Sequence, residues 1–296
     1  MTVDRARGVP QNIAGAAIRK PFHPAIQSSQ HPLPKALDTM NRTILTATAL
    51  LVLSSIVLLP VCASAQDMDD TETHNALTPE ERADGWKLLF DGETTEGWRG
   101  YNDDAFPETG WTVEDGVLTI QGSDGSVSGS GGDIVTTDTY DDFILKLEWK
   151  ISEGGNSGVF YRAIEQPSQT IYWSAPEMQV LDNANHPDAN RGEDGNRKAG
   201  SLYDLIPAAP QTFSGHGEWH EAMIVAEGSH IEHWLNGEKV LEYEMWTPDW
   251  YQMIRDSKFG DHPEFGDAHE GYIGLQDHGT TAHFRNIKIK EIEGGM

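Results

Sequence analysis

The sequence predicts an all-β fold, a two-sheet antiparallel sandwich, and three observations lead to this prediction. Apolar segments of strand length recur at short intervals, and most are bounded by turn-forming residues. The chain contains 30 glycines. It has no long stretch with the 3.6-residue periodicity of an amphipathic helix. Short strands separated by frequent turns are typical of a sandwich, in which each sheet buries one face against the other.

The first 65 residues stand apart from this pattern. Residues 1–39 are rich in Pro, Ser and Gln without periodicity, and we discount them as a leader or a misassigned start. Residues 40–65 have the layout of a secretory signal peptide, with a basic start, an apolar run and the small-x-small tripeptide Ala63-Ser64-Ala65. We expect cleavage before Gln66 and export to the periplasm or out of the cell.

Two alternatives concern the same segment. The apolar run could be a transmembrane anchor, but it barely reaches spanning length and ends at Pro60. Cys62 could carry a lipid, but Pro60 and Val61 stand where a lipoprotein signal has small residues. Membrane attachment is therefore not expected after cleavage.

The remaining chain is strongly acidic. Residues 1–65 hold six of the 21 basic and two of the 47 acidic side chains, so the 231 residues after them carry 15 basic and 45 acidic groups, a net charge of −30. Such a charge repels nucleic acid and anionic membranes, so neither is an expected partner. The single cysteine, Cys62, lies in the expected signal peptide, which excludes disulfides and thiol chemistry from the mature chain. A chain of this length can bury one domain core.

An acidic linker covers residues 66–84, and the first strands follow it. One helical turn is expected after Thr78, an N-cap residue followed by proline and two acids. Short apolar segments then predict strands at 86–90, 111–113 and 116–120. The stretch 143–151 reads FILKLEWKI and places its five apolar residues on one face of a strand.

The later elements pair as hairpins. A turn at 153–156 leads into a strand at 157–162, and a further strand is expected at 177–181. The strands 220–226, 230–235 and 239–243 follow, with Asn236-Gly237 as a type I′ turn signal between the last two. A closing pair is predicted at 272–276 and 282–292, with a bulge-like shift near Asn286. Residues 246–269 interrupt the regular succession of short strands. This segment predicts a long, ordered, functional loop with at most one helical turn.

Polar and apolar residues alternate in the strand 177–181. If Met178 and Val180 face the core, Glu177 and Gln179 face the open side of a sheet. A carboxylate and an amide on a curved sheet can bind sugar hydroxyls. The alternative is an ordinary solvated strand face.

The residues around this strand extend the same argument. Asp182 and Asn183 follow it directly, and Tyr172, Trp173 or Trp234 could cover the apolar face of a sugar ring. Asp182 and Asn183, with Asp188, Glu193 and Asp194, could instead coordinate calcium through oxygen atoms, although their spacing is unspecific. The sequence requires no cofactor, and a structural or catalytic calcium ion stays an open alternative.

A second polar cluster lies at residues 274–279. Gln276 and His278 fall on the same side, and Asp277 could orient His278 as a general base. The alternative is a simple turn. His233 is a further candidate for substrate binding, although a lone histidine among apolar neighbours is more often a core residue with one satisfied hydrogen bond.

Seven segments in order resemble the 3-keto-disaccharide hydrolase family, formerly a domain of unknown function. They are GWKLLFDGETTEGWRGY, GNSGVFYR, PEMQVLDNANHPDA, KAGSLYDLIPA, WHEAMIVAEGSHIEHWLNGEKVLEYE, SKFGDHPEFG and GYIGLQDHGTTAHFRNIKIKEI. The match covers residues 85–292. The resemblance implies a concanavalin A-like jelly roll and activity on glycosides oxidised at C3 of the sugar. A C3 ketone acidifies the C2 hydrogen, so a base can remove it and the C1 aglycone can leave, by elimination or net hydrolysis.

This chemistry needs a base, a donor to the enolate oxygen and an acid for the leaving group. Glu177 or His278 is expected as the base, with Asp277 orienting His278. Arg162 or Lys198 is expected to supply positive charge to the enolate. The expected substrate-binding residues are Trp173, Gln179, Asp182, Asn183, Tyr203, His233 and Gln276. An acidic insertion at 191–197 departs from the family pattern and could alter specificity.

Three functional classes remain at this point. The chain could be an enzyme that acts on a carbohydrate, a non-catalytic carbohydrate-binding module on the same fold, or a structural protein. Only an enzyme needs titratable groups that converge in one cleft. The sequence favours the enzyme, and it predicts that Glu177, Gln179, Gln276 and His278 meet.

Overall fold

A computed structural model describes residues 74–123 and 131–292. The signal peptide, Cys62 and most of the Gly-Ser run at 122–132 therefore lie outside the described residues. No helix in the described ranges is long and apolar enough to cross a membrane.

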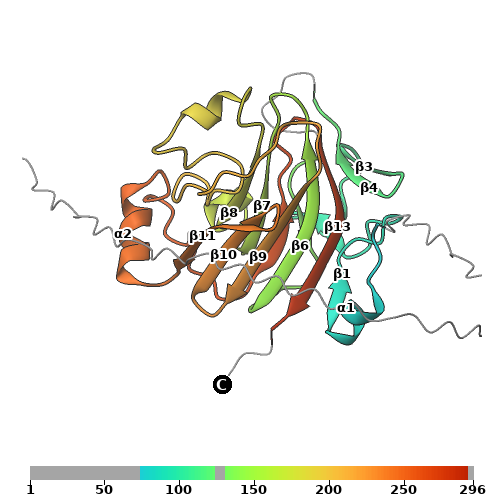
Figure 1. The fold of residues 1–296 in the computed structure, drawn as a ribbon. Helices are drawn as coiled ribbons and strands as arrows, with labels where there is room; N and C mark the ends of the chain where they lie inside the picture. Colours follow the sequence, from blue (N-terminus) through green and yellow to red (C-terminus); the bar gives the residue numbers. More distant parts are fainter. Residues whose placement is uncertain (1–73, 124–130, 293–296) are drawn as a thin grey trace, which may run out of the picture. The chain divides into compact units, whose positions relative to one another are not determined.

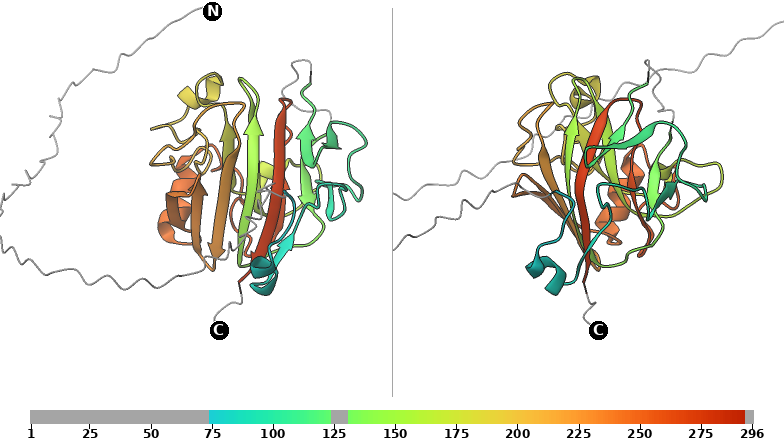
Figure 2. Two further views of the ribbon diagram at one scale, coloured as in Figure 1. Left: turned by 45° about the vertical axis from the view of Figure 1, so that its right-hand side comes forward. Right: turned by 90° about the vertical axis from the view of Figure 1, so that its right-hand side faces the viewer.

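Two antiparallel sheets pack face to face and confirm the predicted all-β, two-sheet antiparallel sandwich (Figures 1 and 2). The larger sheet has eight strands: β1 (Trp86–Leu88), β3 (Trp111–Glu114), β4 (Val117–Ile120), β6 (Phe143–Ile151), β9 (His220–Glu227), β10 (His230–Leu235), β11 (Glu238–Glu244) and β13 (Ala282–Glu291). The smaller sheet has five: β2 (Trp98–Gly100), β5 (Ile134–Thr136), β7 (Asn156–Ala163), β8 (Glu177–Leu181) and β12 (Tyr272–Leu275).

The order of strands places distant segments side by side. The path of the larger sheet is β11-β10-β9-β6-β13-β4-β3, with β1 paired to β13, and that of the smaller sheet is β2-β5-β12-β7-β8. Strand β12 thus lies between β5 and β7, and β8 forms an edge. The chain near residue 276 is thereby brought close to the strand that holds Glu177.

Alternation explains the core. Every second residue of β6 is buried, beginning at Phe143, and these side chains meet Val159, Tyr161, Met178 and Val180 of the smaller sheet in one apolar cluster. The opposite face of the smaller sheet carries a second, smaller cluster: Val135, Phe160, Ala163, Ile171 and Ala175. The smaller sheet is therefore covered on both faces.

Local signals also behave as predicted. The helix α1 (Pro79–Ala83) begins after Thr78, whose hydroxyl accepts from the amide of Glu81 in a capping box. Asn236 and Gly237 have φ of 53° and 79°, the left-handed values of a type I′ turn. The register of β13 against β6 shifts between Arg285 and Lys288, where a bulge was expected.

The stretch 246–269 holds more helix than predicted. Helix α2 (Pro248–Asp256) is nine residues long and has Thr247 as its N-cap. Trp250 and Ile254 point to one side and are buried, and the Trp250 ring stacks on Tyr243 of β11 at 5.2 Å between centroids. Two 3-10 turns, η1 (Ile171–Trp173) and η2 (Pro187–Asn190), complete the elements.

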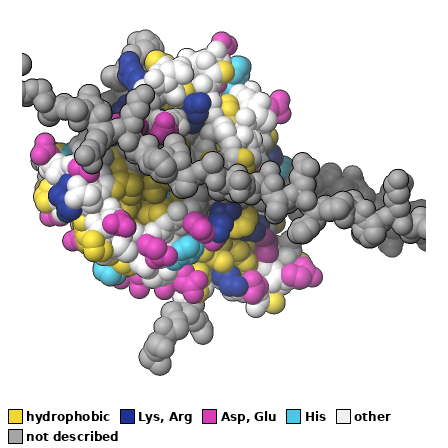
Figure 3. Space-filling view, turned by 60° about the vertical axis from the view of Figure 1, so that its left-hand side comes forward, with side chains coloured by type: hydrophobic (Ala, Val, Ile, Leu, Met, Phe, Trp, Pro, Cys, Tyr) yellow, Lys and Arg dark blue, Asp and Glu magenta, His cyan; other side chains and the backbone are white. Residues whose placement is uncertain are grey.

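On the face shown in Figure 3, Asp and Glu are scattered among uncharged side chains and are not gathered in one patch. This distribution agrees with a solvated acidic surface.

Candidate active site

A small pocket lies on the outer face of the smaller sheet, and we call it the Glu177 pocket. Its cavity volume is about 130 Å³. Its lining residues come from β7, β8, the end of β12, η1 and two loops: Asn156, Tyr172, Glu177, Gln179, Tyr203, Lys258, Gln276 and His278. The four side chains that the sequence predicted to meet are all among them.

The pocket is more enclosed than an open strand face. Met178 and Val180 point into the main core, as expected, but Glu177 is only 5% exposed and Gln179 only 1%. The cause is a segment at 200–203, which adds to the free edge of β8. The amide of Gln179 donates to Ser201 O at 3.0 Å, and the amide of Tyr203 donates to Glu177 O at 3.0 Å.

Gly158 makes room for the carboxyl group of Glu177. Gly158 lies in β7 directly opposite Gln179, next to Glu177 on the same face of the sheet. A Cβ atom at this position would collide with the Oε1 atom of Glu177. The absence of a side chain at Gly158 therefore allows the carboxyl group to lie flat on the sheet.

Enclosure sets the electrostatics of Glu177. Burial raises the pKa of Glu177 to about 8; Lys258 acts in the opposite direction, and Asp133 and Asp188 add to the increase. A carboxyl group with such a pKa changes its charge close to neutral pH. This is the property of a general acid or base.

Lys258 is brought to the pocket by the loop after α2. The helix ends at Asp256, and Phe259 is buried just beyond it, where its ring stacks on Phe265 at 4.0 Å. The Lys258 ammonium lies 3.9 Å above the centre of the Tyr203 ring. Loss of surrounding water lowers the pKa of Lys258, against the opposing effect of Glu177.

Two acceptor atoms in the pocket have no hydrogen-bond partner among the described residues. They are Oδ1 of Asn156 and Oε1 of Gln276, and both are buried. The Asn156 backbone is fixed, because its amide donates to the Thr280 hydroxyl at 2.8 Å. Unpaired buried acceptors are costly, so they suit a ligand that brings hydroxyl groups.

His278 lines the pocket, but Asp277 does not orient it as predicted. The Asp277 carboxylate accepts from the amides of Gly131 and Gly279, each at 3.0 Å, and lines a neighbouring cavity. The His278 ring instead lies edge-on to His186, with 6.4 Å between centroids. The two residues diverge because neighbours in an extended chain point in opposite directions.

The aromatic wall of the pocket is Tyr172 and not Trp173. Trp173 stacks on His262 at 3.9 Å between centroids, outside the pocket. Tyr172 is 42% exposed and free to cover a ligand. Tyr203 is present as predicted, and its hydroxyl donates to Asp188 at 2.8 Å.

The two predicted cations lie outside the pocket. Arg162 is fully buried at φ 51°; its guanidinium donates to Asp141 O at 3.0 Å and packs over Trp246. Lys198 lies in the loop between η2 and β9 and does not line the pocket. Neither residue lines the Glu177 pocket, contrary to expectation, because Arg162 bonds within the protein; the basic residue that lines this pocket is Lys258.

His233 is a core residue and not a substrate ligand. It is fully buried, with Nδ1 3.1 Å from Gly200 O and Nε2 2.9 Å from the Tyr161 hydroxyl. Because Gly200 O can only accept, Nδ1 carries the proton and Nε2 accepts from Tyr161. Burial lowers the pKa of His233 to about 4.

Asp182 and Asn183 support the end of β8 and do not line the pocket. The Asp182 carboxylate accepts from the Gly154 amide at 2.8 Å and from Asn185 at 2.7 Å. The Asn183 side chain accepts from the Ala199 amide at 2.8 Å. These oxygens are used within the protein, so the calcium site considered from the sequence gains no support.

One group of His and acidic residues in the described ranges has metal-ligand spacing. It consists of His230, Glu232 and Glu242, on the other sheet. The Lys239 ammonium already binds both carboxylates there, at 3.0 and 2.5 Å. This group is therefore an ion-pair cluster.

Sequence reasoning missed two lining residues, Asn156 and Lys258. Asn156 was assigned to a turn, although it is the first residue of β7. Lys258 lies in the aromatic-rich segment 246–269, which interrupts the succession of strands. This interruption was the only sequence signal that the segment could contribute to the site.

Comparisons with known proteins agree with this arrangement. Residues 85–290 match the 3-keto-alpha-glucoside-1,2-lyase-like domain. A 3-keto-disaccharide hydrolase of Bacteroides thetaiotaomicron is 45% identical over 232 residues, which are 71% of this chain and 80% of that protein.

Two solved structures from Parabacteroides distasonis, both described as candidate glycosyl hydrolases, share the fold. The first is 35% identical with a TM-score of 0.67, covering 75% of this chain and all of that one. The second is 29% identical with a TM-score of 0.53, covering 70% of this chain and 99% of that one. From this match over most of its length, the chain belongs to the family of 3-keto-alpha-glucoside-1,2-lyase-like domains.

Proposed function

We propose that this protein is an exported glycoside-cleaving enzyme that acts on sugars oxidised to a ketone at C3. The observation that carries this proposal is the Glu177 carboxyl group, buried near Lys258 in a small pocket where its pKa is raised to about 8. The Bacteroides relative is named for hydrolysis of 3-keto-disaccharides, which supports the same substrate class.

The reaction proceeds by elimination. A base takes the proton from C2, and the electron pair of that C–H bond forms an enolate across C2, C3 and the former ketone oxygen. The enolate then expels the aglycone, as the C1–O bond breaks and a C1–C2 double bond forms. The departing oxygen takes a proton. Water then adds to C1 and a proton to C2, so the net result is hydrolysis.

Glu177 is the base in this scheme. Its raised pKa makes the carboxylate a stronger base than an ordinary glutamate while a useful fraction remains ionised near neutral pH. The gap at Gly158 keeps the carboxyl group in one place. The proton is taken by a group already shielded from water.

Lys258 and His278 act on the two substrate oxygen atoms, the enolate oxygen and the leaving oxygen. The Lys258 ammonium stabilises the enolate oxygen, the role expected of Arg162 or Lys198 from the sequence. His278, which lies in the segment after β12, protonates the leaving oxygen. Asn156, Gln179 and Gln276 bind the sugar hydroxyls, and Tyr172 covers the ring.

A binding module is the competing function. It would need amides and aromatic rings but neither a carboxyl group that titrates near pH 8 nor a lysine beside it. The convergence of Glu177, Lys258 and His278 favours the enzyme.

The test is incubation of the pure protein with native and 3-oxidised glucosides, with and without chelator. We expect release of the aglycone from the oxidised compounds alone. Binding of both kinds without turnover would support the binding module instead. Loss of turnover in chelator would add a metal to the mechanism.

Export rests on the signal peptide, which lies outside the described residues. The expected mature N-terminus is Gln66. Sequencing the N-terminus of the protein secreted from a bacterial host checks this. A chain retained in the cytoplasm with residues 40–65 intact would contradict it.

A further inference from the structure

We propose that a second cavity on the same face, the Asp133 pocket, binds the sugar that leaves, and that it selects leaving groups without negative charge. The cavity volume is about 500 Å³. The cavity is lined by residues between 100 and 109 at the end of β2 and after it, by residues 131–133 before β5, by Gln169 and Thr170, and by Asp277. The inference deepens the proposed function and rests on it.

The two pockets adjoin through shared segments of chain. His278 lines the Glu177 pocket and Asp277 lines the Asp133 pocket, and neighbouring Cα atoms are about 3.8 Å apart. In the same way, Thr170 lines the Asp133 pocket and Tyr172 lines the Glu177 pocket. Asp133 lies near enough to Glu177 to raise the pKa of that carboxyl group. In this proposal, the bond that joins the two sugar rings crosses from one pocket to the other beside the segment that holds Asp277 and His278.

The geometry of the sugar places the leaving group on the side of the Asp133 pocket. The keto group at C3 and the leaving group at C1 flank C2 on opposite sides. With Lys258 at the ketone oxygen and His278 at the leaving oxygen, the aglycone extends past His278. A third cavity, the Arg197 pocket, has a volume of about 450 Å³ but adjoins through Lys258, on the ketone side.

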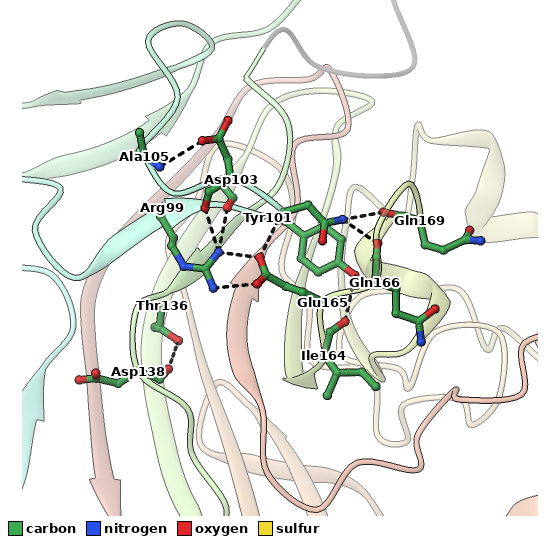
Figure 4. A network of polar contacts seen from close by, with 12 residues as sticks. Arg99, Tyr101, Asp103, Ala105, Thr136, Asp138, Ile164, Glu165, Gln166 and Gln169 are labelled. Atoms are coloured by element: carbon green, nitrogen blue, oxygen red, sulfur yellow. Dashed lines mark hydrogen bonds and ion pairs between the residues drawn. The ribbon is translucent and has the colours of Figure 1, made fainter.

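The rim of the Asp133 pocket is preorganised. Figure 4 shows Arg99 paired with Glu165 and the Tyr101 hydroxyl donating to Ile164 O, the latter at 2.9 Å. The Asn102 side chain donates to Gln166 O at 2.9 Å and to Gln169 O at 3.1 Å. These bonds fix the loop 164–170 against the loop after β2, so the pocket is formed before a ligand arrives.

The charge of the lining determines which leaving groups fit. Four carboxyl groups line the pocket, those of Asp103, Glu108, Asp133 and Asp277, and none of the described lining residues is Lys or Arg. Carboxylates accept hydrogen bonds from sugar hydroxyls but repel another carboxylate. A neutral sugar or an amino sugar therefore suits the pocket, and a uronic acid does not.

The first experiment fills each flanking pocket in turn. Thr170→Trp fills the Asp133 pocket, and Glu193→Trp, the matched control, fills the Arg197 pocket. The measured quantity is kcat/KM for 3-keto-maltose divided by kcat/KM for methyl 3-keto-glucoside. We expect this ratio to fall at least tenfold in Thr170→Trp and to stay within twofold in Glu193→Trp. The reverse pattern, or an unchanged ratio in both variants, overturns the proposal.

The second experiment reverses one charge. Glu108→Lys should raise the relative kcat/KM for a 3-keto-glucoside of glucuronic acid over 3-keto-maltose at least fivefold. Glu238→Lys, with the same change of charge on the edge strand β11, should leave the preference unchanged. Equal effects of both variants would mean that net charge alone sets the preference, which contradicts the pocket. If the wild-type protein cleaves neither methyl 3-keto-glucoside nor 3-keto-maltose, the proposed function fails and the pocket assignment fails with it; if the wild-type protein cleaves both and Thr170→Trp leaves their ratio unchanged, only the pocket assignment fails.

Discussion

Glu177 and Glu232 are two glutamates in similar local positions with opposite electrostatic behaviour. Each lies on a β-strand, points away from the main core and has a lysine nearby. Burial acts to raise the pKa of Glu232, but hydrogen bonds from Lys239, Trp234 and His230 outweigh it, and the net pKa is lowered. For Glu177, the increase in pKa caused by burial outweighs the decrease caused by Lys258, and the pKa rises to about 8.

The difference comes from what covers each strand. On the larger sheet the side chains around Glu232 reach it directly and form ion pairs in solvent. On the smaller sheet the 200–203 segment and η1 close over Glu177, and no side chain donates a hydrogen bond to it in the described residues. A polar residue becomes reactive when its surroundings remove water without replacing the lost bonds.

The largest expected effect comes from removing the reactive carboxylate. Glu177→Gln should lower kcat for a 3-keto-glucoside by about 100- to 10,000-fold, because general base catalysis supplies that much. Glu232→Gln is the matched control and should keep turnover within twofold. Steady-state kinetics on the two folded variants measures this, and similar losses in both would break the comparison.

The next effect tests the lysine beside each glutamate. Lys258→Met should lower kcat by about 100- to 1,000-fold, as expected for removal of one enolate-stabilising group. Because Lys258 lowers the pKa of Glu177, the rising limb of the kcat/KM profile should also move from about pH 8 to higher pH. Lys239→Met should change neither quantity, and an unmoved limb in Lys258→Met would show that the lysine does not act on Glu177.

A smaller loss is expected when the gap beneath Glu177 is filled. Gly158→Ala should push the carboxyl group off the sheet and lower kcat about tenfold or more, with little change in KM if the hydroxyl contacts persist. Circular dichroism and thermal melting establish that the variant folds. Wild-type kcat in a folded Gly158→Ala protein would show that the position of the carboxyl group is not critical.

The smallest effect is on stability. The folded pKa of Glu177, about 8, exceeds its ordinary value of 4.5, so the folded state binds the extra proton between these values. The resulting contribution to stability is complete below about pH 4.5 and is lost as pH rises through 8. The Glu177→Gln variant cannot lose this contribution, so its Tm relative to wild type should rise by roughly 10 °C between pH 5 and pH 8.5. A Tm difference independent of pH would mean that Glu177 ionises normally.

Alternation of apolar residues predicted most of the fold. Strand β6 has the predicted bounds, and β8, β10 and the turn at Asn236 also follow the sequence signals. The strands β2 and β5 were missed, because three residues are too few to show a period; β1 is equally short, but it lies in the longer apolar segment 86–90.

The site was predicted in part, and the errors have one cause. Periodicity shows which side of its own strand a residue occupies, and together with the family resemblance it predicted that Glu177, Gln179, Gln276 and His278 meet, as they do in one pocket. It does not show which loop covers that side. Lys258 was therefore missed, and Arg162 was placed in a pocket that its bonds to the Asp141 and Asp142 region prevent it from reaching.

Exchange of the C2 hydrogen with solvent tests the central claim most directly. With methyl 3-keto-glucoside in D₂O, followed by NMR, wild-type protein should incorporate deuterium at C2. His278→Ala should still exchange this position while releasing little methanol, and Glu177→Gln should exchange it at least 100-fold more slowly. Exchange by Glu177→Gln at the wild-type rate would contradict the assignment of Glu177 as the base.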